Sequence, residues 1–320
     1  MNFKNVSVNT AFPGKARSRV MIIYTGGTFG MTQNAEGVLV PFDFAHILEH
    51  LPTLRNLSLD LTVISFDQPI DSSNIEPAHW QMMARLLFQH RAEQDGFVVL
   101  HGTDTMAYTA SALSFMLPDF GKPVVFTGAQ LPISHPRSDA RENLITALEI
   151  ASAKNGPHAQ VPEVCIHFGS ELLRGNRSKK VESMHFDAFQ SENYPPLAKA
   201  GVKITYNESA IAAPGPTARL LDRYDAGVAI LKMFPGISLA AVQALFEAPG
   251  LRAVVIETYG SGNAPTSGAF LELLRSAMAR GILLVNISQC PGGMVIQGKY
   301  ETSRHLQALG VLGGSDMTTE

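Results

Sequence analysis

Short runs of apolar, β-branched residues alternate along the chain with longer segments whose apolar residues recur every three to four positions. The first pattern is typical of buried strands and the second of amphipathic helices. In the first half we expect strands at 20–24, 60–66, 96–101, 122–127 and 162–168, and helices at 43–51, 77–91, 104–117 and 138–153. This alternation predicts βαβ units, with a parallel sheet and helices on both of its faces.

Two of the expected helices carry recognisable start signals. Pro77 occupies a first helical position, where its missing N–H costs nothing. The helix at 138–153 opens with Asp139 and Glu142 at the spacing of a capping box.

The pattern lapses at about 187–222, where proline, glycine and one strand-like piece at 201–206 interrupt it. A second alternation follows, with strands expected at 226–232, 251–257 and 282–287 and helices at 238–246, 266–280 and 301–309. We therefore expect an α/β protein of two domains. A larger N-terminal parallel-sheet α/β domain would span 1–190, an inter-domain linker 191–222 and a smaller C-terminal α/β domain 223–320.

Composition narrows the class of protein. A chain of 320 residues, 45% hydrophobic and 17% charged, is long enough for two globular domains. Its net charge of -3 argues against general affinity for nucleic acid or acidic membranes. No apolar run reaches the length of a membrane span, and the first 19 residues lack the apolar core of a secretory signal. With only Cys165 and Cys290, both expected to be buried, we expect a soluble cytoplasmic protein.

Polar residues follow several of the expected strands directly. The run at 20–23 ends in YTGGTFG at 24–30, and the strand at 96–101 ends in Thr103 and Asp104. Thr127 ends the next strand, and the sequence DSS follows the second one at 71–73. Because the carboxyl ends of parallel strands meet at one edge of a sheet, we expect Thr28 and these residues to line one crevice.

Three familiar chemistries fit that crevice poorly. The glycines at 26–30 match neither a dinucleotide fingerprint nor a phosphate-binding P-loop, and nearby carboxylates would repel phosphate. The ten histidines form no metal-ligand motif, and we expect hydrogen-bonding roles for His101 and His135. No G-x-S-x-G elbow indicates a serine triad.

A threonine hydroxyl remains as the candidate nucleophile, and it needs a neighbouring base or relay because its own pKa is high. Thr103 and Asp104 could form that relay with a lysine, for which Lys179 and Lys180 are the candidates. Plainer interpretations stay open here: Thr28 could cap a turn, and the basic segment at 174–180 could be a solvated loop.

The motifs YTGGT at 24–28 and HGTDTMAYTA at 101–110 resemble the two signatures of the L-asparaginase family. DSS at 71–73, RGNR at 174–177, TYGSGNAP at 258–265 and Gln289-Cys290 resemble its bacterial, cytosolic type I branch. The similarity extends over nearly the whole chain.

This resemblance implies hydrolysis of L-asparagine to L-aspartate and ammonia without a cofactor or a metal. Thr28 matches the nucleophile, while Thr103, Asp104 and Lys180 match a second triad that activates water. Asp71 and Ser72 match groups that hold the substrate's α-ammonium and α-carboxylate, and donors near Ala129 would stabilise the oxyanion. Asn263 matches a residue lent by a neighbouring subunit, which implies a homodimer or homotetramer. Since asparagine and glutamine differ by one methylene, we expect room for a weak glutaminase side activity.

The chain departs from the family's pattern in the loop after the first motif. Many members have a tyrosine in the loop after the first motif, whereas the matching stretch at 34–41 has none. Glu36, another tyrosine or the Thr103 relay would have to take its role. Two alternatives therefore stay beside the hydrolase: the asparaginase-like subunit of a tRNA-dependent amidotransferase, and an amino-acid-binding sensor of weak activity.

Overall fold

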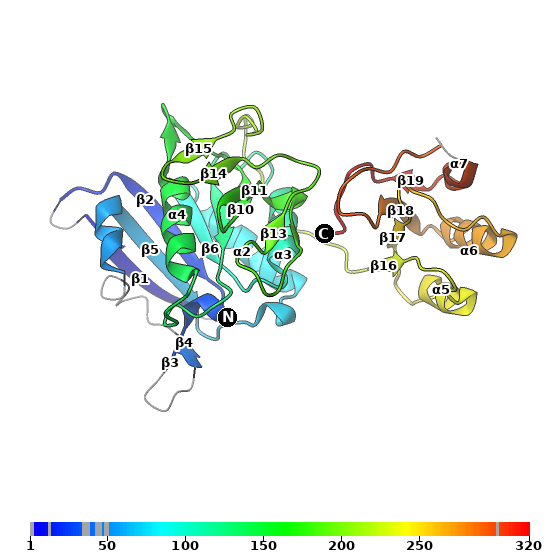
Figure 1. The fold of residues 1–320 in the computed structure, drawn as a ribbon, viewed down its shortest axis with the longest axis horizontal. Coiled ribbons are helices and arrows are strands. Elements are labelled where there is room, and N and C mark those ends of the chain that lie inside the picture. The colour runs from blue at the N-terminus through cyan, green and yellow to red at the C-terminus, as the bar shows by residue number, and fades with distance from the viewer. Residues whose placement is uncertain (1–2, 12–13, 34–38, 42–46, 48–50, 299–300) are drawn as a thin grey trace. The chain divides into compact units, whose positions relative to one another are not determined.

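A computed structural model describes residues 3–11, 14–33, 39–41, 47, 51–298 and 301–320 (Figure 1). The chain forms two compact units, Met1–Arg223 with the terminal Glu320, and Tyr224–Thr319. Each unit has its own sheet and its own hydrophobic core, which confirms the predicted two-domain α/β class.

The first unit is built on a nine-stranded sheet of order β1-β5-β2-β6-β7-β10-β11-β14-β15. In that order the strands are Phe3–Asn9, Leu59–Phe66, Ser18–Tyr24, Gly96–Leu100, Val124–Thr127, Val164–Phe168, Glu171–Arg174, Ala198–Ala200 and Ile204–Tyr206. The five strands from β5 to β10 are parallel, as predicted. The sheet as a whole is mixed, because β1, β11, β14 and β15 join it antiparallel.

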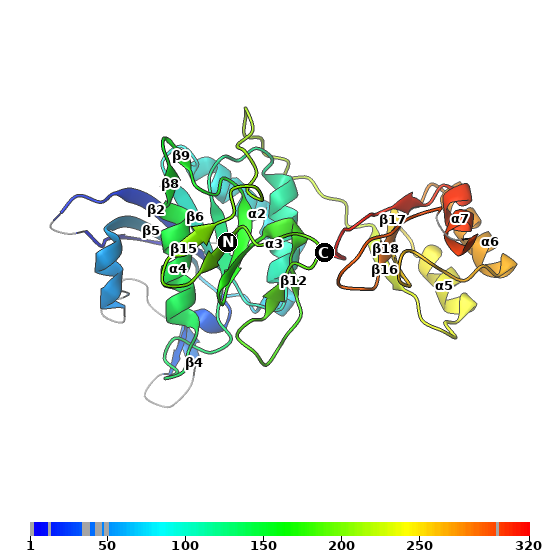
Figure 2. The same cartoon turned by 45° about the horizontal axis from the view of Figure 1, so that its top comes forward.

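Helices cover both faces of the parallel strands. Helix α4 (Ala140–Ser152) lies on one face, and α2 (Pro77–His90) and α3 (Met106–Met116) lie on the other (Figures 1 and 2). The side chains of β2 alternate accordingly, with Ile22 in the core beneath α4 and Ile23 in the core beneath α2 and α3. The three helices begin and end within two residues of the predicted bounds. The helix expected at 43–51 lies almost wholly outside the described residues.

The segment predicted as a linker, 191–222, differs in the structure. Strands β14 and β15 within it extend the large sheet, and Leu197 and Ala198 are buried in its core. Farther along, the N–H groups of Arg219 and Leu221 donate to carbonyls at the end of α3. Strands of three residues are too short to show a period, which is why the pattern appeared to lapse.

The second unit carries a four-stranded parallel sheet of order β16-β17-β18-β19. Its elements are β16 (Val228–Lys232), α5 (Leu239–Phe246), β17 (Ala253–Thr258), α6 (Gly268–Ala279), β18 (Leu283–Ser288), α7 (Glu301–Leu309) and β19 (Leu312–Gly313). All but β19 were predicted. Ser238 and Ser267 cap the N-termini of α5 and α6, because each serine side chain accepts a hydrogen bond from a backbone N–H group of its helix.

Smaller elements connect these layers. The two-stranded sheets pair β3 (Met31–Gln33) with β4 (Leu39–Pro41), β8 (Lys154–Asn155) with β9 (His158–Ala159), and β12 (Lys179–Lys180) with β13 (Phe189–Gln190). The 3₁₀ segments are η1 (Thr28–Gly30), η3 (Pro52–Leu57), η4 (Ser72–Asn74) and η5 (Gly175–Arg177).

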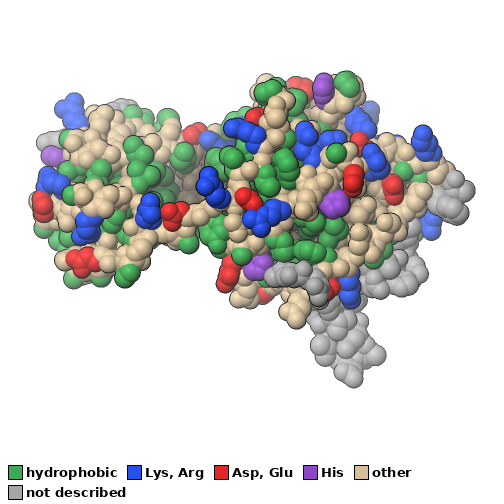
Figure 3. Space-filling view, turned by 180° about the vertical axis from the view of Figure 1, so that it is seen from behind, with side chains coloured by type: hydrophobic (Ala, Val, Ile, Leu, Met, Phe, Trp, Pro, Cys, Tyr) green, Lys and Arg blue, Asp and Glu red, His purple; other side chains and the backbone are tan. Residues whose placement is uncertain are grey.

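The described surface mixes both signs of charge (Figure 3). Among the described residues, no helix combines the length and apolar character needed to cross a membrane. Cys165 is buried as expected, but Cys290 is exposed because it follows β18 in a surface turn.

Two histidines are buried near strand ends of the large sheet, His101 after β6 and His167 within β10, with β7 between these strands. Burial lowers the pKa of each to about 4, against a slight opposing effect from a backbone carbonyl beside the ring. Both imidazoles are therefore neutral in the folded protein at ordinary pH.

We expect the free energy of unfolding to rise with pH between about 4 and 6.5. In that window the histidines of the unfolded chain bind protons, whereas the two buried histidines of the folded protein stay neutral. Each buried histidine therefore contributes up to about 1.4 kcal/mol per pH unit to the rise in the free energy of unfolding. Urea unfolding across this range measures the slope. His167→Asn should flatten it and the exposed control His158→Asn should not; equal slopes in all three proteins would contradict the assignment.

Candidate functional site

The order of the parallel strands creates a crevice at one edge of the large sheet. From β2 the chain crosses to β5 on one side and then to β6 on the other, so the connections diverge between β2 and β6. Ligands of open α/β sheets bind at such switch points, outside the carboxyl ends of the strands. The candidate residues follow β2, β5 and β6, the three strands at this point.

Backbone hydrogen bonds tie the three strand ends together. The N–H and the hydroxyl of Thr25 both donate to the carbonyl of Leu100, each at 3.0 Å. The N–H of Ile70, after β5, donates to the carbonyl of Thr25 at 2.8 Å. Thr25 is buried and fully engaged in this tie, so it is structural.

Two glycines allow the loops to touch. Gly27 has a φ of +85°, and a Cβ there would lie 2.6 Å from the Cα of Gly102. A Cβ on Gly102 would in turn lie 2.6 Å from the hydroxyl oxygen of Ser72. The residues next in sequence, Thr28 and Thr103, are thereby brought to the same place as Ser72.

Thr28 begins the turn η1, with its side chain exposed and Phe29 and Gly30 buried beneath it. The ring of Tyr24 packs directly against Gly30. Burial raises the pKa of the Tyr24 hydroxyl well above its ordinary value, so this tyrosine is a neutral phenol and a poor base. Of the two threonines in this motif, Thr28 is exposed and Thr25 is buried.

Lys180 joins the end of β6 through two short contacts. Its ammonium donates to the hydroxyl of Thr103 at 2.7 Å and to the carboxylate of Asp104 at 2.8 Å. The lysine side chain is 16% exposed and the aspartate side chain 66% exposed, so the pair lies at the mouth of the crevice. The structure therefore brings together Thr103, Asp104 and Lys180, as predicted.

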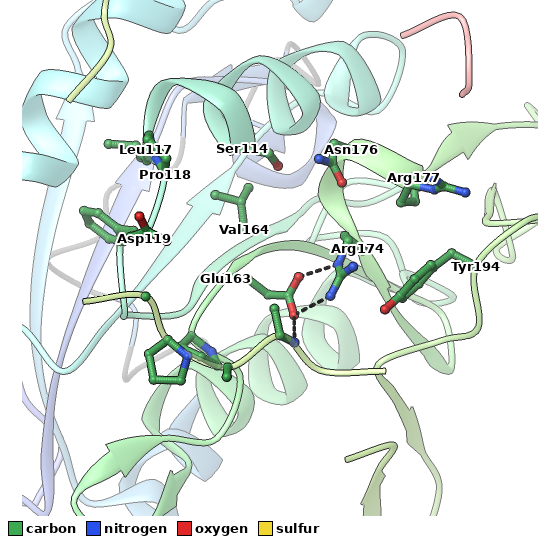
Figure 4. Close-up of a pocket in the computed structure, with 16 residues that line it drawn as sticks. Ser114, Leu117, Pro118, Asp119, Glu163, Val164, Arg174, Asn176, Arg177 and Tyr194 are labelled. Carbon is green, nitrogen blue, oxygen red and sulfur yellow. Dashed lines mark hydrogen bonds and ion pairs between the residues drawn. The ribbon is translucent and has the colours of Figure 1, made fainter. Parts of the chain in front are cut away.

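The segment before Lys180 is packed rather than solvated. The Arg174 guanidinium donates to both carboxylate oxygens of Glu163 and lies 4.3 Å from the centre of the Tyr194 ring (Figure 4). These groups line a cavity of about 360 Å³ that contains none of the predicted site residues. Since β12 also pairs with β13, the backbone that carries Lys180 is held on two sides.

Asp71 and Ser72 form the wall supplied by β5. Asp71 accepts the N–H of Ser73 at 2.9 Å and its hydroxyl at 2.8 Å, and these hydrogen bonds lower the pKa of the carboxyl. Ser72 is buried, and its carbonyl accepts the Thr105 hydroxyl at 2.7 Å. An ionised carboxylate is thus followed directly by a buried serine at this strand end.

A clamp not predicted from the sequence holds the loop after β7, which contains Ala129. The Asp139 carboxylate accepts the N–H groups of Gln130 and Leu131 at 3.0 to 3.2 Å. Asn143 donates to the carbonyl of Gly128 at 3.0 Å and to Asp139 at 3.1 Å. Asp139 therefore makes no cap hydrogen bond to α4, and the expected capping box is absent because its carboxylate is used by the loop.

Other expected crevice residues have structural roles. Thr127 is buried, with its hydroxyl donating to the carbonyl of His167 at 2.8 Å, so it does not line the crevice. The His101 ring lies 2.7 Å from the carbonyl of Gly102 and 3.0 Å from the hydroxyl of Thr109. His135 accepts the N–H of Arg137 at 3.1 Å. The expectation that both histidines are hydrogen-bonding residues is in keeping with these contacts.

Two further predicted residues belong to other parts of the chain. Asn263 lies in the second unit, where it forms a β-bridge with Tyr259. Glu36 lies outside the described residues. Within the described parts of the chain, no group of three or more histidine, cysteine or acidic side chains could hold a metal ion.

Comparison with known proteins bears on this arrangement of two threonines, a lysine and carboxylates at one sheet edge. Residues 19–212 match the model of the asparaginase N-terminal domain, and residues 227–320 match that of the glutaminase/asparaginase C-terminal domain. The chain belongs to the asparaginase family. The predicted resemblance is confirmed.

Individual relatives, found by sequence or by solved structure, support the same family. L-asparaginase 1 of Escherichia coli is 40% identical over 95% of this chain and 89% of its own length. The 60 kDa lysophospholipase of Homo sapiens is 39% identical over 94% of this chain and 56% of its own length. The crystal structure of L-asparaginase I from Vibrio cholerae has a TM-score of 0.83 at 36% identity, covering 95% of this chain and 90% of that one.

Gly102→Ala should weaken substrate binding without unfolding the protein. The new methyl group must displace the Ser72 side chain, so a group proposed to hold the substrate moves, and the KM for asparagine should rise roughly tenfold, equivalent to about 1.4 kcal/mol of binding free energy. Steady-state ammonia release measures it. Gly268→Ala, where a Cβ meets open space, is the matched control; an unchanged KM in Gly102→Ala would show that Ser72 does not contact substrate.

Proposed function

We propose that this protein hydrolyses L-asparagine to L-aspartate and ammonia through an acyl-enzyme on Thr28, with Thr103, Asp104 and Lys180 as a proton relay. The observation that carries the proposal is the pair of contacts from Lys180 to Thr103 and Asp104, one residue from the point where Gly102 touches Gly27. Amidohydrolase activity on asparagine also agrees with the family and with the E. coli relative.

Substrate recognition follows from the charges of an α-amino acid. The ammonium group needs carboxylates, which Asp71 and Asp104 supply, and Asp71 is held ionised by its bonds from Ser73. The α-carboxylate needs donors, for which the Ser72 hydroxyl is the nearest candidate. The side-chain amide of the bound substrate would then extend towards Thr28.

The reaction divides into two balanced acyl transfers. In the first, Thr28 Oγ bonds to the amide carbon, the C–N bond breaks, and the threonine's proton leaves with the nitrogen as ammonia. In the second, water attacks the ester, its hydroxyl joins the aspartate carboxyl, and its proton restores Thr28. Lys180 and Thr103 receive and return the water's proton. No electron is transferred in either step, so the reaction needs no redox cofactor.

The loop after β7 would stabilise the oxyanion of each tetrahedral intermediate. Backbone groups at Ala129 and Thr103 flank the crevice, and the Asp139 clamp keeps the loop in place before substrate arrives. Such pre-placed donors are worth about 3–4 kcal/mol in related chemistries. Glutamine is one methylene longer than asparagine, and a site can discriminate against such a difference by only about 1–3 kcal/mol. We therefore propose a weak glutaminase side activity.

Turnover by the purified protein alone tests the assignment against its two alternatives. Ammonia should be released steadily from asparagine without tRNA or a second protein. Activity that requires tRNA and a partner would instead indicate an amidotransferase subunit. Binding of asparagine without turnover would indicate a sensor. We also propose a cytoplasmic location, which cell fractionation would test.

Thr28→Ala should abolish turnover while asparagine still binds, because the nucleophile is lost and Asp71 and Ser72 remain. Rates of ammonia release and binding by calorimetry measure the two effects separately. Thr25→Val removes the hydroxyl bond to Leu100 and keeps the backbone N–H bond, so it should lower stability by about 1 kcal/mol and leave the chemistry in place. A kcat in Thr28→Ala equal to that of the native protein would eliminate the acyl-enzyme.

We further propose that Asn263 completes the active site of a neighbouring subunit in a homodimer or homotetramer. Thr28→Ala and Asn263→Ala proteins should each be nearly inactive, and activity should return when they are mixed and allowed to exchange subunits. Recovery occurs because one site of a mixed dimer then has native residues from both chains. No recovery, or a fully active monomer in size-exclusion chromatography, would contradict the shared site.

A further inference from the structure

The hydroxyl of Thr103 has two polar neighbours, one for its oxygen and one for its proton. Lys180 Nζ lies 2.7 Å away, and Gln130 Oε1, from the loop after β7, lies 3.4 Å away. An ammonium group has only donors, so while Lys180 is protonated it must occupy a lone pair of Thr103. The hydroxyl proton of Thr103 then points to Gln130.

The orientation of the Gln130 amide is determined by its other contact. Gln130 Nε2 lies 3.0 Å from the backbone carbonyl of His185, in the loop between β12 and β13. A carbonyl can only accept, so the amide nitrogen faces His185 and the amide oxygen faces Thr103. The Gln130 backbone N–H is held by Asp139 at 3.0 Å. Both the backbone and the amide of this residue are therefore fixed.

We propose that Gln130 is a positioning residue that sets the proton affinity of the Thr103–Lys180 relay. By accepting the Thr103 proton, it stabilises the arrangement in which Lys180 is an ammonium. When Lys180 loses a proton, its nitrogen becomes a second acceptor and the Thr103 hydroxyl turns to it. This inference rests on the proposed role of Thr103 and Lys180 in the hydrolysis.

Other charges near the relay are present in the native protein and in every Gln130 variant. Asp104 bonds Lys180, and Asp139 bonds the backbone N–H of Gln130. The others are Lys179 on the same strand as Lys180, and Glu182, His185 and Asp187 in the loop after β12. Helix α3 and strand β13, which pack near β12, carry no charged residue. A change in the pH profile on substitution of Gln130 is thus attributable to that side chain.

Two substitutions should move the pH profile in opposite directions. Gln130→Met keeps the length but removes the acceptor, so the acid limb of kcat/KM for asparagine should move to lower pH by roughly half to one unit, the worth of an ordinary hydrogen bond. Gln130→Glu keeps an acceptor oxygen and adds a negative charge, so the limb should move to higher pH by about one unit or more. A residue that merely supports the loop would not give shifts of opposite sign.

Controls separate this inference from the proposed function. Gln160→Met removes a surface amide that bonds only Glu208, so the profile should stay as in the native protein. Thermal unfolding of each variant checks that the fold is retained. Lys180→Met should cost several orders of magnitude in kcat if the proposed relay operates.

The outcomes are distinguishable. If Lys180→Met abolishes turnover while both Gln130 variants keep the native pH profile, Gln130 has no influence on the relay and the inference is overturned. If both variants shift the limb in the same direction, the effect comes from disturbance of the loop, which also overturns it. If Lys180→Met retains native activity, the proposed function itself fails.

Discussion

The close contact of three strand-end loops at the switch point of the large sheet determines everything else about this site. Gly27 lies against Gly102, and Gly102 against Ser72, at separations that exclude any side chain. The sequence alone would place the threonines and carboxylates at the ends of these strands, whether or not the loops touched. This backbone contact joins the loop that carries the exposed Thr28 to the loop of Thr103 and to Ser72, which is the arrangement that the proposed reaction needs.

Around that contact, side-chain to backbone hydrogen bonds hold each loop before any ligand binds. Thr25 ties β2 to β6, Asp139 clamps the loop of Ala129, and Arg174 with Glu163 secures the approach to Lys180. These polar groups use their hydrogen-bonding capacity within the protein, on backbone groups and, for Arg174 and Glu163, on each other. The groups proposed for catalysis are thus carried by a pre-organised frame, which is where electrostatic catalysis obtains its advantage over water.

Much of the fold and of the candidate site could be predicted from the sequence. The same physical reasons explain which parts could not. Buried parallel strands read as continuous apolar runs, so β2, β5, β6, β7 and β10 were located with the polar residues that follow them. The exposed edge strand β1 and the three-residue strand β14 gave no periodic signal, and β15 was seen only as part of the strand-like piece at 201–206. Long-range contacts were also beyond reach: Asp139 satisfied a capping pattern locally, yet the fold brings the carboxylate to Gln130 and Leu131. Thr127 and Cys290 could not be classed as buried or exposed from their neighbours in sequence.

The central claim is that Thr28 carries the acyl group of the substrate. It is tested most directly by quenching the protein in acid during turnover of asparagine, digesting it and finding the modified peptide by mass spectrometry. We expect one aspartyl group in ester linkage, located on Thr28 and absent from the Thr28→Ala protein. An aspartyl ester on Thr103, or active protein that never carries an acyl group under conditions where deacylation is slow, would contradict the account.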